Sequence, residues 1–301
     1  MSELKPTFTA AQAISSPLVT IGLPTYNRPA GLRKALEWIG KQTHPSLEII
    51  ISDNCSTEEE VQKITAEYAA KDQRIKVFRQ LENIGLENNF NFVYAQSTAP
   101  YFIWMSDDDF FEANYIADCV NFLEQNRDHV LCSGIAKYYS GDQYVFSETM
   151  FRTDQENITA RVHHYFANVQ KNGNFYGVFR NKMFSNDPIQ LHVGCDWSFM
   201  ARLAVLGKLT YIDSTAYHRS AEGNSQTRKK MVEKFNLTRI KKFFFETYLA
   251  YVIAAHIFTD PVINKKVRLI KRKLLTVMVF FQINWKLFFK FIRKLFKAGN
   301  R

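Results

Sequence analysis

The sequence predicts an α/β protein whose mostly parallel sheet is covered by helices on both faces. Short runs rich in β-branched and aromatic residues alternate with amphipathic helical segments between residues 18 and 133. The connections are short, as is typical of strand–helix–strand units with parallel strands. Ligands of such sheets bind beyond the carboxyl ends of the strands, so the residues that follow each strand are the first candidates for function.

The predicted elements follow one another in a regular order. Apolar runs predict strands at 18–23, 47–52, 75–79, 101–105 and 130–133. Pro29 opens a helix that extends to about Gln42 and carries an apolar stripe of Leu32, Leu36 and Ile39. Ser56 and Glu59 have the spacing of a capping box for a second helix. Further helices are expected at 86–96, 114–126 and 197–206.

Composition excludes several classes of protein. The chain has 301 residues, of which 46% are hydrophobic and 15% aromatic, so it is neither collagen-like nor disordered. Its four cysteines form no CxxC pair, which argues against a zinc module or a disulfide scaffold. The amino terminus does not resemble a secretory signal. The longest nearly uncharged apolar run, at 274–285, is shorter than the roughly 20 residues of a membrane span.

Charge is divided unevenly along the chain. Residues 228–301 hold 19 of the 39 Lys and Arg residues and only three of the 29 acids, which gives this segment +16 and the rest −6. Two functional zones are therefore expected. We predict a leader at 1–17, a catalytic or binding domain at 18–227, and a basic amphipathic helical region at 228–301.

Polar segments follow the first four predicted strands. They are Pro-Thr-Tyr-Asn-Arg at 24–28, Asp-Asn-Cys-Ser-Thr at 53–57, the amide-rich segment 82–89, and Ser-Asp-Asp-Asp at 106–109. Neither the GxGxxG nor the GxxxxGK[ST] motif occurs, so no glycine-rich loop is available to bind phosphates. Each of the first three segments, taken alone, also fits an ordinary turn or helix cap.

The acidic segment at 106–109 is the strongest local signal. Three adjacent carboxylates repel one another, and they are tolerable when a hard divalent cation supplies compensating charge. Carboxylate, water and phosphate oxygens are the ligands that Mg²⁺ and Mn²⁺ prefer. A solvated acidic turn is the alternative, but the deeply apolar run Tyr-Phe-Ile-Trp-Met before it directs the acids toward one place.

Taken together and in this order, these segments resemble the family 2 inverting glycosyltransferases of bacterial cell-surface polysaccharide synthesis. The resemblance covers about residues 18–225 and implies the GT-A fold, a Rossmann-like mixed sheet flanked by helices. It also implies a nucleotide-sugar donor and a Mn²⁺ or Mg²⁺ cofactor. Three positions depart from the family pattern, because Asn54, Ser106 and Cys195 stand where acidic residues are usual.

The resemblance assigns roles to individual residues. Asp196, which opens a helix after a glycine, takes the place of the catalytic base. Asp53 is expected to contact the nucleobase and Asp107 the donor ribose, and the resemblance leaves open which of Asp107, Asp108 and Asp109 binds metal directly. The remaining assignments are Pro24, Thr25, Tyr26, Arg28, Asn83 and Asn88 for the donor nucleotide, Asp108, Asp109 and His218 for the metal, and Arg219 for the diphosphate. Acceptor contacts are expected within 134–195, where Tyr138, Tyr139, Phe175, Tyr176 and His192 are candidates that fit the core equally well.

The basic tail contains an amphipathic segment. In residues 286–297 basic side chains recur on one side of a helix and apolar side chains on the other. Such helices lie in the headgroup plane of anionic membranes. We expect membrane contacts from Lys286, Lys290, Arg293, Lys294, Phe288 and Phe291. Packing on the catalytic domain or on a second subunit is the alternative. The membrane is favoured for 265–297, and packing is favoured for 243–256. A nucleic-acid patch would leave the apolar stripe without a use.

These features predict a metal-dependent inverting glycosyltransferase that lies on the cytoplasmic, inner face of the cell membrane. Its acceptor is expected to be a glycan or glycolipid, most simply a lipid-linked sugar, and a homo-oligomer is possible. Two alternatives remain. A nucleotidyltransferase could use a similar fold, although such enzymes usually carry a glycine-rich basic loop after the first strand. A non-catalytic membrane-bound scaffold is the other, and the intact acidic cluster and Asp196 argue against it.

Overall fold

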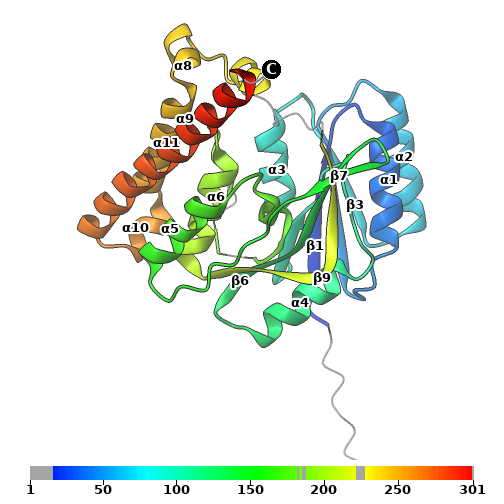
Figure 1. The fold of residues 1–301 in the computed structure, drawn as a ribbon. Helices are drawn as coiled ribbons and strands as arrows, with labels where there is room; N and C mark the ends of the chain where they lie inside the picture. Colours follow the sequence, from blue (N-terminus) through cyan, green and yellow to red (C-terminus); the bar gives the residue numbers. More distant parts are fainter. Residues whose placement is uncertain (1–15, 182, 185–187, 222–227, 300–301) are drawn as a thin grey trace, which may run out of the picture.

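A computed structural model describes residues 16–181, 183–184, 188–221 and 228–299 of the chain. In this part of the chain, nine strands form one mixed sheet in the order β3-β2-β1-β4-β8-β6-β9-β5, with β7 beside β6 (Figure 1). Strands β1 to β4, β6 and β9 run in one direction, and β5, β7 and β8 run in the other. The predicted α/β fold class with a mostly parallel sheet is therefore confirmed.

The amino-terminal half of the sheet was anticipated almost residue for residue, and the carboxyl-terminal half was not. The first four strands are β1 (Val19–Thr25), β2 (Leu47–Asp53), β3 (Ile75–Arg79) and β4 (Tyr101–Trp104). The others are β5 (Phe110–Phe111), β6 (His129–Ser140), β7 (Gln143–Ser147), β8 (Val178–Arg180) and β9 (Lys208–Ser220). Of these five, only the start of β6 was predicted, because short or bent strands lack a clear alternation of apolar and polar residues.

The helices of the body are α1 (Pro29–Gly40), α2 (Glu59–Lys71), α3 (Leu86–Ala95), α4 (Tyr115–Gln125), α5 (Ile158–Asn168) and α6 (Cys195–Leu206), with a short 3₁₀ turn, η1 (Gly173–Tyr176). The predicted capping box of α2 is wrong. Ser56 lies before the helix, and its hydroxyl accepts a hydrogen bond from the backbone N–H of Asn27 at 2.9 Å. The side-chain carbonyl of Asn27 in turn accepts bonds from the N–H groups of Thr57 and Glu58. The loops after β1 and β2 are thus fastened to each other.

Two hydrophobic clusters cover the faces of the sheet. One cluster joins β1, β2 and β4 to the buried sides of α1, α2 and α4. The other joins the opposite face to α3, α5 and α6, and it contains a stack of aromatic rings around Trp104. Because both faces are covered, only the ends of the strands remain open to a ligand.

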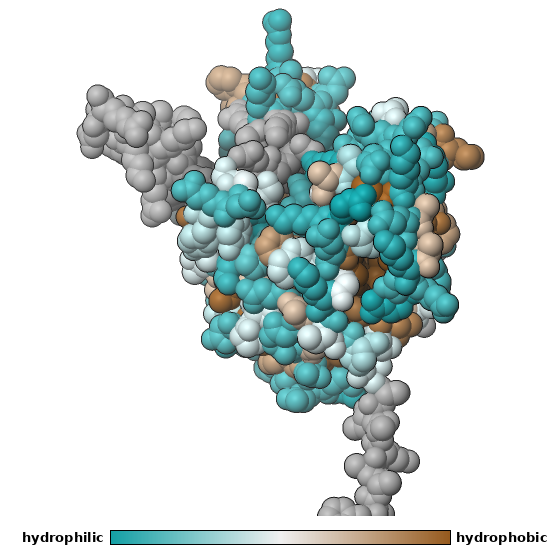
Figure 2. Space-filling model, turned by 90° about the vertical axis from the view of Figure 1, so that its right-hand side faces the viewer, coloured by the Kyte–Doolittle hydropathy of each residue, from teal (hydrophilic) through white to brown (hydrophobic). Residues whose placement is uncertain are grey.

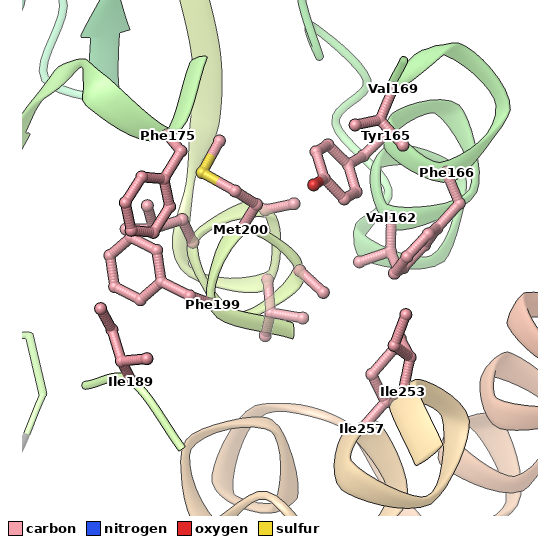
Figure 3. Close-up of a cluster of buried hydrophobic side chains, with 14 of the residues drawn as sticks. Val162, Tyr165, Phe166, Val169, Phe175, Ile189, Phe199, Met200, Ile253 and Ile257 are labelled. Atoms are coloured by element: carbon pink, nitrogen blue, oxygen red, sulfur yellow. The ribbon is translucent and has the colours of Figure 1, made fainter. Parts of the chain in front are cut away.

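The carboxyl-terminal region is helical and packs onto the body. Its helices are α7 (Arg228–Lys234), α8 (Arg239–Phe243), α9 (Phe245–Thr259), α10 (Pro261–Lys266) and α11 (Leu269–Gly299). Ile253 and Ile257 of α9 point into the cluster formed by α5 and α6 (Figure 3). The division into domains predicted at residue 228 stays a prediction, since α9 and α11 share this core with the body.

A buried ion pair also joins this region to the body. Arg202 of α6 lies 3.0 Å from the carboxylate of Asp260, and both side chains are almost completely buried. Asp260 accepts hydrogen bonds from the N–H groups of Val262 and Ile263 and thereby caps α10. In the part of the chain that the structure describes, no helix combines the length and the apolar character needed to cross a membrane.

Candidate functional site

A cavity of about 560 Å³ opens where the strands of the sheet end. It is lined by the loops after β1, β2 and β4, by the start of α6, by the end of β9 and by residues 231–235. Many of the residues expected to form the site lie in its wall. They are Pro24, Thr25, Tyr26, Arg28, Asn83, Asp107, Asp108, Asp109, Asp196 and Arg219.

The loop after β1 holds the acidic segment in place. The hydroxyl of Thr25 donates a hydrogen bond to Asp107 Oδ2 at 2.8 Å. Arg28 Nη1 lies 3.0 Å from Asp107 Oδ1 and 2.8 Å from Asp108 Oδ2, so one guanidinium bridges two carboxylates. Burial raises the pKa of Asp107 to about 6, although Arg28 and Thr25 act in the opposite direction. The contacts with Arg28 and Thr25 therefore offset only part of the cost of burying the Asp107 carboxylate.

Asp108 and Asp109 face different surroundings. The side chain of Asp108 is 28% exposed, whereas that of Asp109 is 4% exposed. Asp109 accepts hydrogen bonds from the Tyr217 hydroxyl and, at 2.9 Å, from the Ser220 N–H, so its oxygens are used to hold the end of β9. Burial raises its pKa to about 6. Asp108 is thus the one acid of the three with exposed carboxylate surface.

His218 lies outside this cavity. Its Nε2 is 3.1 Å from a carboxylate oxygen of Glu112, and its ring stacks on Phe110 with 4.4 Å between the centroids. Burial lowers the pKa of the imidazole. It lines a neighbouring cavity of about 450 Å³, to which Asp108 and Arg219 also contribute. Among the described residues, no three His, Cys, Asp or Glu side chains are grouped so as to hold a metal ion.

Asp53 and Asn88 also lie outside the wall of the main cavity. Asp53 is buried, forms an ion pair with Arg79 at 2.5 Å, and accepts a hydrogen bond from the Ser56 N–H at 2.9 Å. Asn88 is exposed on α3, where its amide donates to the carbonyl of Ile84. The residues that contact the cavity in their place are Asn54 and Asn89, which the sequence analysis had not assigned to the donor.

The amides around β2 form a connected polar surface. Asn54 Nδ2 donates to Asn83 Oδ1 at 3.0 Å, and Asn54 Oδ1 accepts from the N–H of Ile84 at 2.9 Å. Asn89 exchanges hydrogen bonds with the hydroxyl and carbonyl of Ser52. Amide groups held in this way present donors and acceptors in fixed directions, and a heterocyclic base is recognised by such groups along its edge.

Asp196 lies in the first turn of α6 and in the wall of the same cavity as the acidic segment. Burial raises its pKa, while a hydrogen bond from the Asn172 amide at 2.9 Å lowers it. Sequence reasoning missed Asn172, which precedes η1 in a left-handed conformation with φ of 59°. An isolated asparagine in an irregular segment gives no periodic signal from which such a contact could be found.

The residue directly before α6 has a backbone conformation and surroundings that favour glycine. Gly194 has a φ of 79°, a conformation that L-residues rarely adopt. A Cβ atom there would also lie 2.8 Å from side-chain carbons of Leu249 and Ile253 in α9. The position of Asp196, two residues later, is therefore set by the backbone of this glycine and by its contact with α9.

Arg219 lies at the junction of the two cavities. Its Nη1 donates to the Tyr138 hydroxyl at 3.0 Å, and its guanidinium lies over the rings of Tyr138, Tyr176 and Tyr217. Its Nε is 3.7 Å from Asp109. A buried cation fixed by aromatic faces is well suited to bind an anionic group that enters the cavity.

The segment after β9 supplies a wall that the sequence analysis had not anticipated. Met231, Glu233, Lys234 and Phe235 contact the cavity. Lys234 forms an ion pair with Glu87 of α3, which also lines the cavity, so this segment is joined to α3. Charged residues in a basic tail look alike in the sequence, so this contact could not be singled out from it.

This sheet, with its acidic segment after β4 and a carboxylate at the start of α6, defines a protein of the GT-A class. The family model of glycosyl transferase family 2 matches residues 20–209, and the chain belongs to this family. Both the resemblance drawn from the sequence and the predicted GT-A fold are thereby confirmed.

Relatives and solved structures agree with this assignment. An uncharacterized glycosyltransferase of Rickettsia felis is 28% identical over 152 residues, which cover 48% of this chain and 25% of that protein. One from Haemophilus influenzae is 30% identical over 118 residues, covering 39% of this chain and 36% of that protein. The structure of S. aureus TarS 1–349 in complex with UDP-GlcNAc has a TM-score of 0.61 at 16% identity and covers 86% of this chain and 70% of that one. The chain therefore spans about a quarter to a third of the length of these two relatives.

Proposed function

We propose that the chain transfers a sugar from a nucleoside-diphosphate sugar to a hydroxyl group of an acceptor, with inversion at the anomeric carbon. The observation that carries the proposal is that the acidic segment 107–109 and the carboxylate of Asp196 line one cavity. The cavity is large enough for a nucleotide sugar, since ligand pockets commonly measure about 300–1,000 Å³. The complex of TarS with UDP-GlcNAc supports a donor of this chemical class.

In this proposal Asp196 removes the proton from the acceptor hydroxyl. Its raised pKa suits the role, because a carboxylate with a raised pKa is a stronger base than an ordinary carboxylate. The hydrogen bond from Asn172 orients the carboxylate and moderates the rise in pKa. Arg219 would offset the negative charge on the departing nucleoside diphosphate.

The donor nucleotide would bind against the loops after β1 and β2. Pro24, Thr25, Tyr26 and Arg28 line the cavity on one side, and Asn83 with Asn54 on another. We do not propose direct contacts from Asp53 and Asn88 to the nucleobase. Asp53 binds Arg79 and the Ser56 N–H and so supports the loop after β2, and Asn88 is exposed on α3. Asp107 remains the proposed ribose contact.

The residues present fit a divalent cation that is bound largely by the substrate. Mg²⁺ and Mn²⁺ are commonly held by one or two carboxylates together with phosphate oxygens, so a cluster of three protein ligands is not required. Asp108 would bind the cation, and Asp109 would contribute its charge from a buried position next to Asp108. His218 would bind the cation only if its contact with Glu112 were broken. When bound, the cation stabilises the negative charge of the diphosphate.

The acceptor is proposed to be a lipid-linked glycan at the inner face of the membrane, in the synthesis of a cell-surface polysaccharide. Support comes from the basic composition of residues 228–301. The side chains expected to meet the lipid, at 286, 288, 290, 291, 293 and 294, lie outside the described residues, although their backbone belongs to α11.

A donor screen tests the proposal. The full chain is incubated with nucleotide sugars and Mn²⁺, and release of nucleoside diphosphate is followed with and without saccharide acceptors. We expect one donor to be consumed, and EDTA to stop the reaction. Release of pyrophosphate from a nucleoside triphosphate and a sugar phosphate would instead identify a nucleotidyltransferase. Failure of every donor to bind, measured by calorimetry, would support a scaffold.

A further inference from the structure

The outer face of α11 is apolar and exposed. Ile270, Leu274, Val277, Phe281 and Trp285 follow one another at the three- and four-residue spacing of a single helix face, and each is between 53% and 74% exposed. Leu275, Val279 and Ile283, on the other side of the same helix, are completely buried. Helix α11 therefore presents one apolar face to the body and a second one to the outside.

Basic residues border this outer face. Lys271 and Lys273 are exposed and lie on either side of it in helical projection, and Lys265, Lys266 and Arg268 precede it. The sequence contains no Asp or Glu after Asp260, and Asp260 itself is buried against Arg202. The charged side chains of α10 and α11 are thus all positive.

A second exposed element lies nearby in the chain. Ile240, Phe243 and Phe244 are between 56% and 76% exposed, in or directly after α8, and they stand among Arg239, Lys241 and Lys242. Helix α8 leads into α9, and α11 packs on α9. Helices α8 and α11 lie on the side of the molecule opposite α1 and α2 (Figure 1). The side that carries α1 and α2 is by contrast largely hydrophilic, with scattered hydrophobic residues (Figure 2).

We propose that the outer face of α11, together with the exposed residues of α8, is a membrane-binding surface for bilayers that contain anionic lipid. A helix with apolar residues flanked by lysines lies in the headgroup region, and an exposed tryptophan is favoured at that depth. An excess of positive charge complements an anionic surface. A second copy of this chain would bring the same positive charges together, which disfavours self-association.

The sequence favours membrane contact for residues 265–297 and packing for 243–256, so the stripe at 270–285 lies within the predicted segment, whereas the exposed residues of α8 lie before it. The surface also bears on the proposed acceptor. The segment 231–235, which lines the cavity, is separated from α8 by only a few residues. A bilayer bound at α8 would therefore be joined to this wall of the cavity by a short stretch of chain, which suits an acceptor that is held in the membrane. This last consequence rests on the proposed function, whereas the binding to vesicles does not.

Vesicle flotation of the full chain tests the apolar face. Wild type should float with phosphatidylcholine vesicles that contain phosphatidylglycerol and much less with phosphatidylcholine alone. The triple variant Leu274→Ser/Val277→Ser/Phe281→Ser should lose at least tenfold in partitioning, while Val145→Ser, an equally exposed residue on β7, should bind like wild type. Equal flotation of all three proteins would overturn the proposal, as would wild type that does not float.

The flanking charges are tested separately. Lys271→Gln and Lys273→Gln should each weaken partitioning about fivefold, and added salt should weaken wild type in the same direction. Lys63→Gln on α2 is the matched control, since it removes an exposed lysine far from this surface. If Lys63→Gln weakens partitioning as much as the other two, only net charge matters and the assigned surface is wrong.

Tryptophan fluorescence reports the position of the lipid. Addition of anionic vesicles should shift the emission of wild type to the blue, and Trp285→Phe should abolish that shift. An unchanged shift in Trp285→Phe would contradict the proposal.

Light scattering after gel filtration tests whether a second copy of the chain covers this face instead. A wild-type dimer that the triple variant converts to a monomer would assign the face to a subunit interface. Donor consumption in vesicle-free buffer should be the same in the triple variant and wild type, so failure of membrane binding and failure of the transferase proposal remain distinguishable.

Discussion

The side-chain amide of Asn172 donates a hydrogen bond to Oδ2 of Asp196 across 2.9 Å. Its carbonyl oxygen accepts a second hydrogen bond, also 2.9 Å long, from the hydroxyl of the buried Tyr165. Asn172 thus connects the proposed catalytic base to the hydrophobic core. This connection fixes the direction of the Asp196 carboxylate without placing a formal charge beside it.

The substitution Asp196→Asn should remove the proposed base and keep the shape of the site. We expect kcat to fall by about 10²–10⁴-fold, the usual contribution of general base catalysis, with donor affinity unchanged. Calorimetry gives donor affinity, and acceptor-dependent release of nucleoside diphosphate gives kcat. Glu233→Gln alters another acid that contacts the cavity and should leave kcat nearly intact. Wild-type turnover in Asp196→Asn, with chemistry limiting the rate, would refute the assignment.

The substitution Asn172→Gly should shift the pH dependence of turnover. Glycine tolerates the left-handed backbone at this position, so the substitution removes the hydrogen bonds to Asp196 and from Tyr165 without straining the backbone. The bond to Asp196 lowers the pKa of that carboxyl, and without it the pKa rises. The base is active when ionised, so the acidic limb of the kcat profile should move to higher pH. Asn236→Gly, at another left-handed asparagine, should leave the profile in place.

The substitution Asp107→Asn should stabilise the cation-free protein near neutral pH. Burial raises the pKa of Asp107 to about 6, above its ordinary value of 3.8. The carboxyl is largely protonated in both states near pH 3, and stability is lost as the pH rises through 6 because the folded protein must ionise a buried group. We expect up to about 3 kcal/mol more unfolding free energy at pH 7.5, with almost no gain near pH 3.

Urea unfolding at the two pH values checks this prediction. Asp72→Asn provides a control of opposite sign, since a hydrogen bond from Arg74 lowers the pKa of Asp72. Removing that carboxylate should slightly destabilise the protein at pH 7.5. A gain for Asp107→Asn that is the same at both pH values would show that the effect does not come from ionisation.

The substitution Asp108→Asn should weaken the cation-dependent part of donor binding. Asp108 has the most exposed carboxylate of the acidic segment, and a neutral amide is a much poorer ligand for Mn²⁺. Calorimetry with the nucleoside diphosphate selected by the donor screen should show at least a tenfold loss with Mn²⁺. In EDTA, variant and wild type should bind alike. Asp142→Asn, at the edge of the neighbouring cavity, serves as a control, and an equal loss there would contradict a specific role for Asp108.

The substitution Arg202→Ala should strongly destabilise the fold. It leaves Asp260 buried without its cationic partner, which typically costs about 3–5 kcal/mol. Urea denaturation measures the loss. Arg127→Ala removes an exposed ion pair with Glu124 and should change stability by less than about 1 kcal/mol. Similar losses in the two variants would mean that the buried pair does not hold α10 to the body.

The sequence was most informative where local pattern and tertiary structure agree. Apolar runs that end abruptly at polar residues predict the positions of β1, β2 and β4. The acidic segment Ser106–Asp109 predicts part of the cavity wall. Residues whose contacts come from distant parts of the chain could not be predicted in the same way. Tyr217 and Ser220 donate hydrogen bonds to Asp109, although they lie more than a hundred residues further along the chain. Glu112 and His218 are hydrogen-bonded across a similar separation. No local spacing records such pairings.

Gly194 has a consequence for engineering in this family. The glycine is compatible with α9 only because it lacks a side chain, so the turn that presents Asp196 and the apolar surface of Leu249 and Ile253 were fitted to each other. A chimera that exchanges the carboxyl-terminal helices of two relatives would graft a new surface against this turn. The carboxylate proposed as its base would be misdirected unless the loop before α6 were transplanted together with the helices.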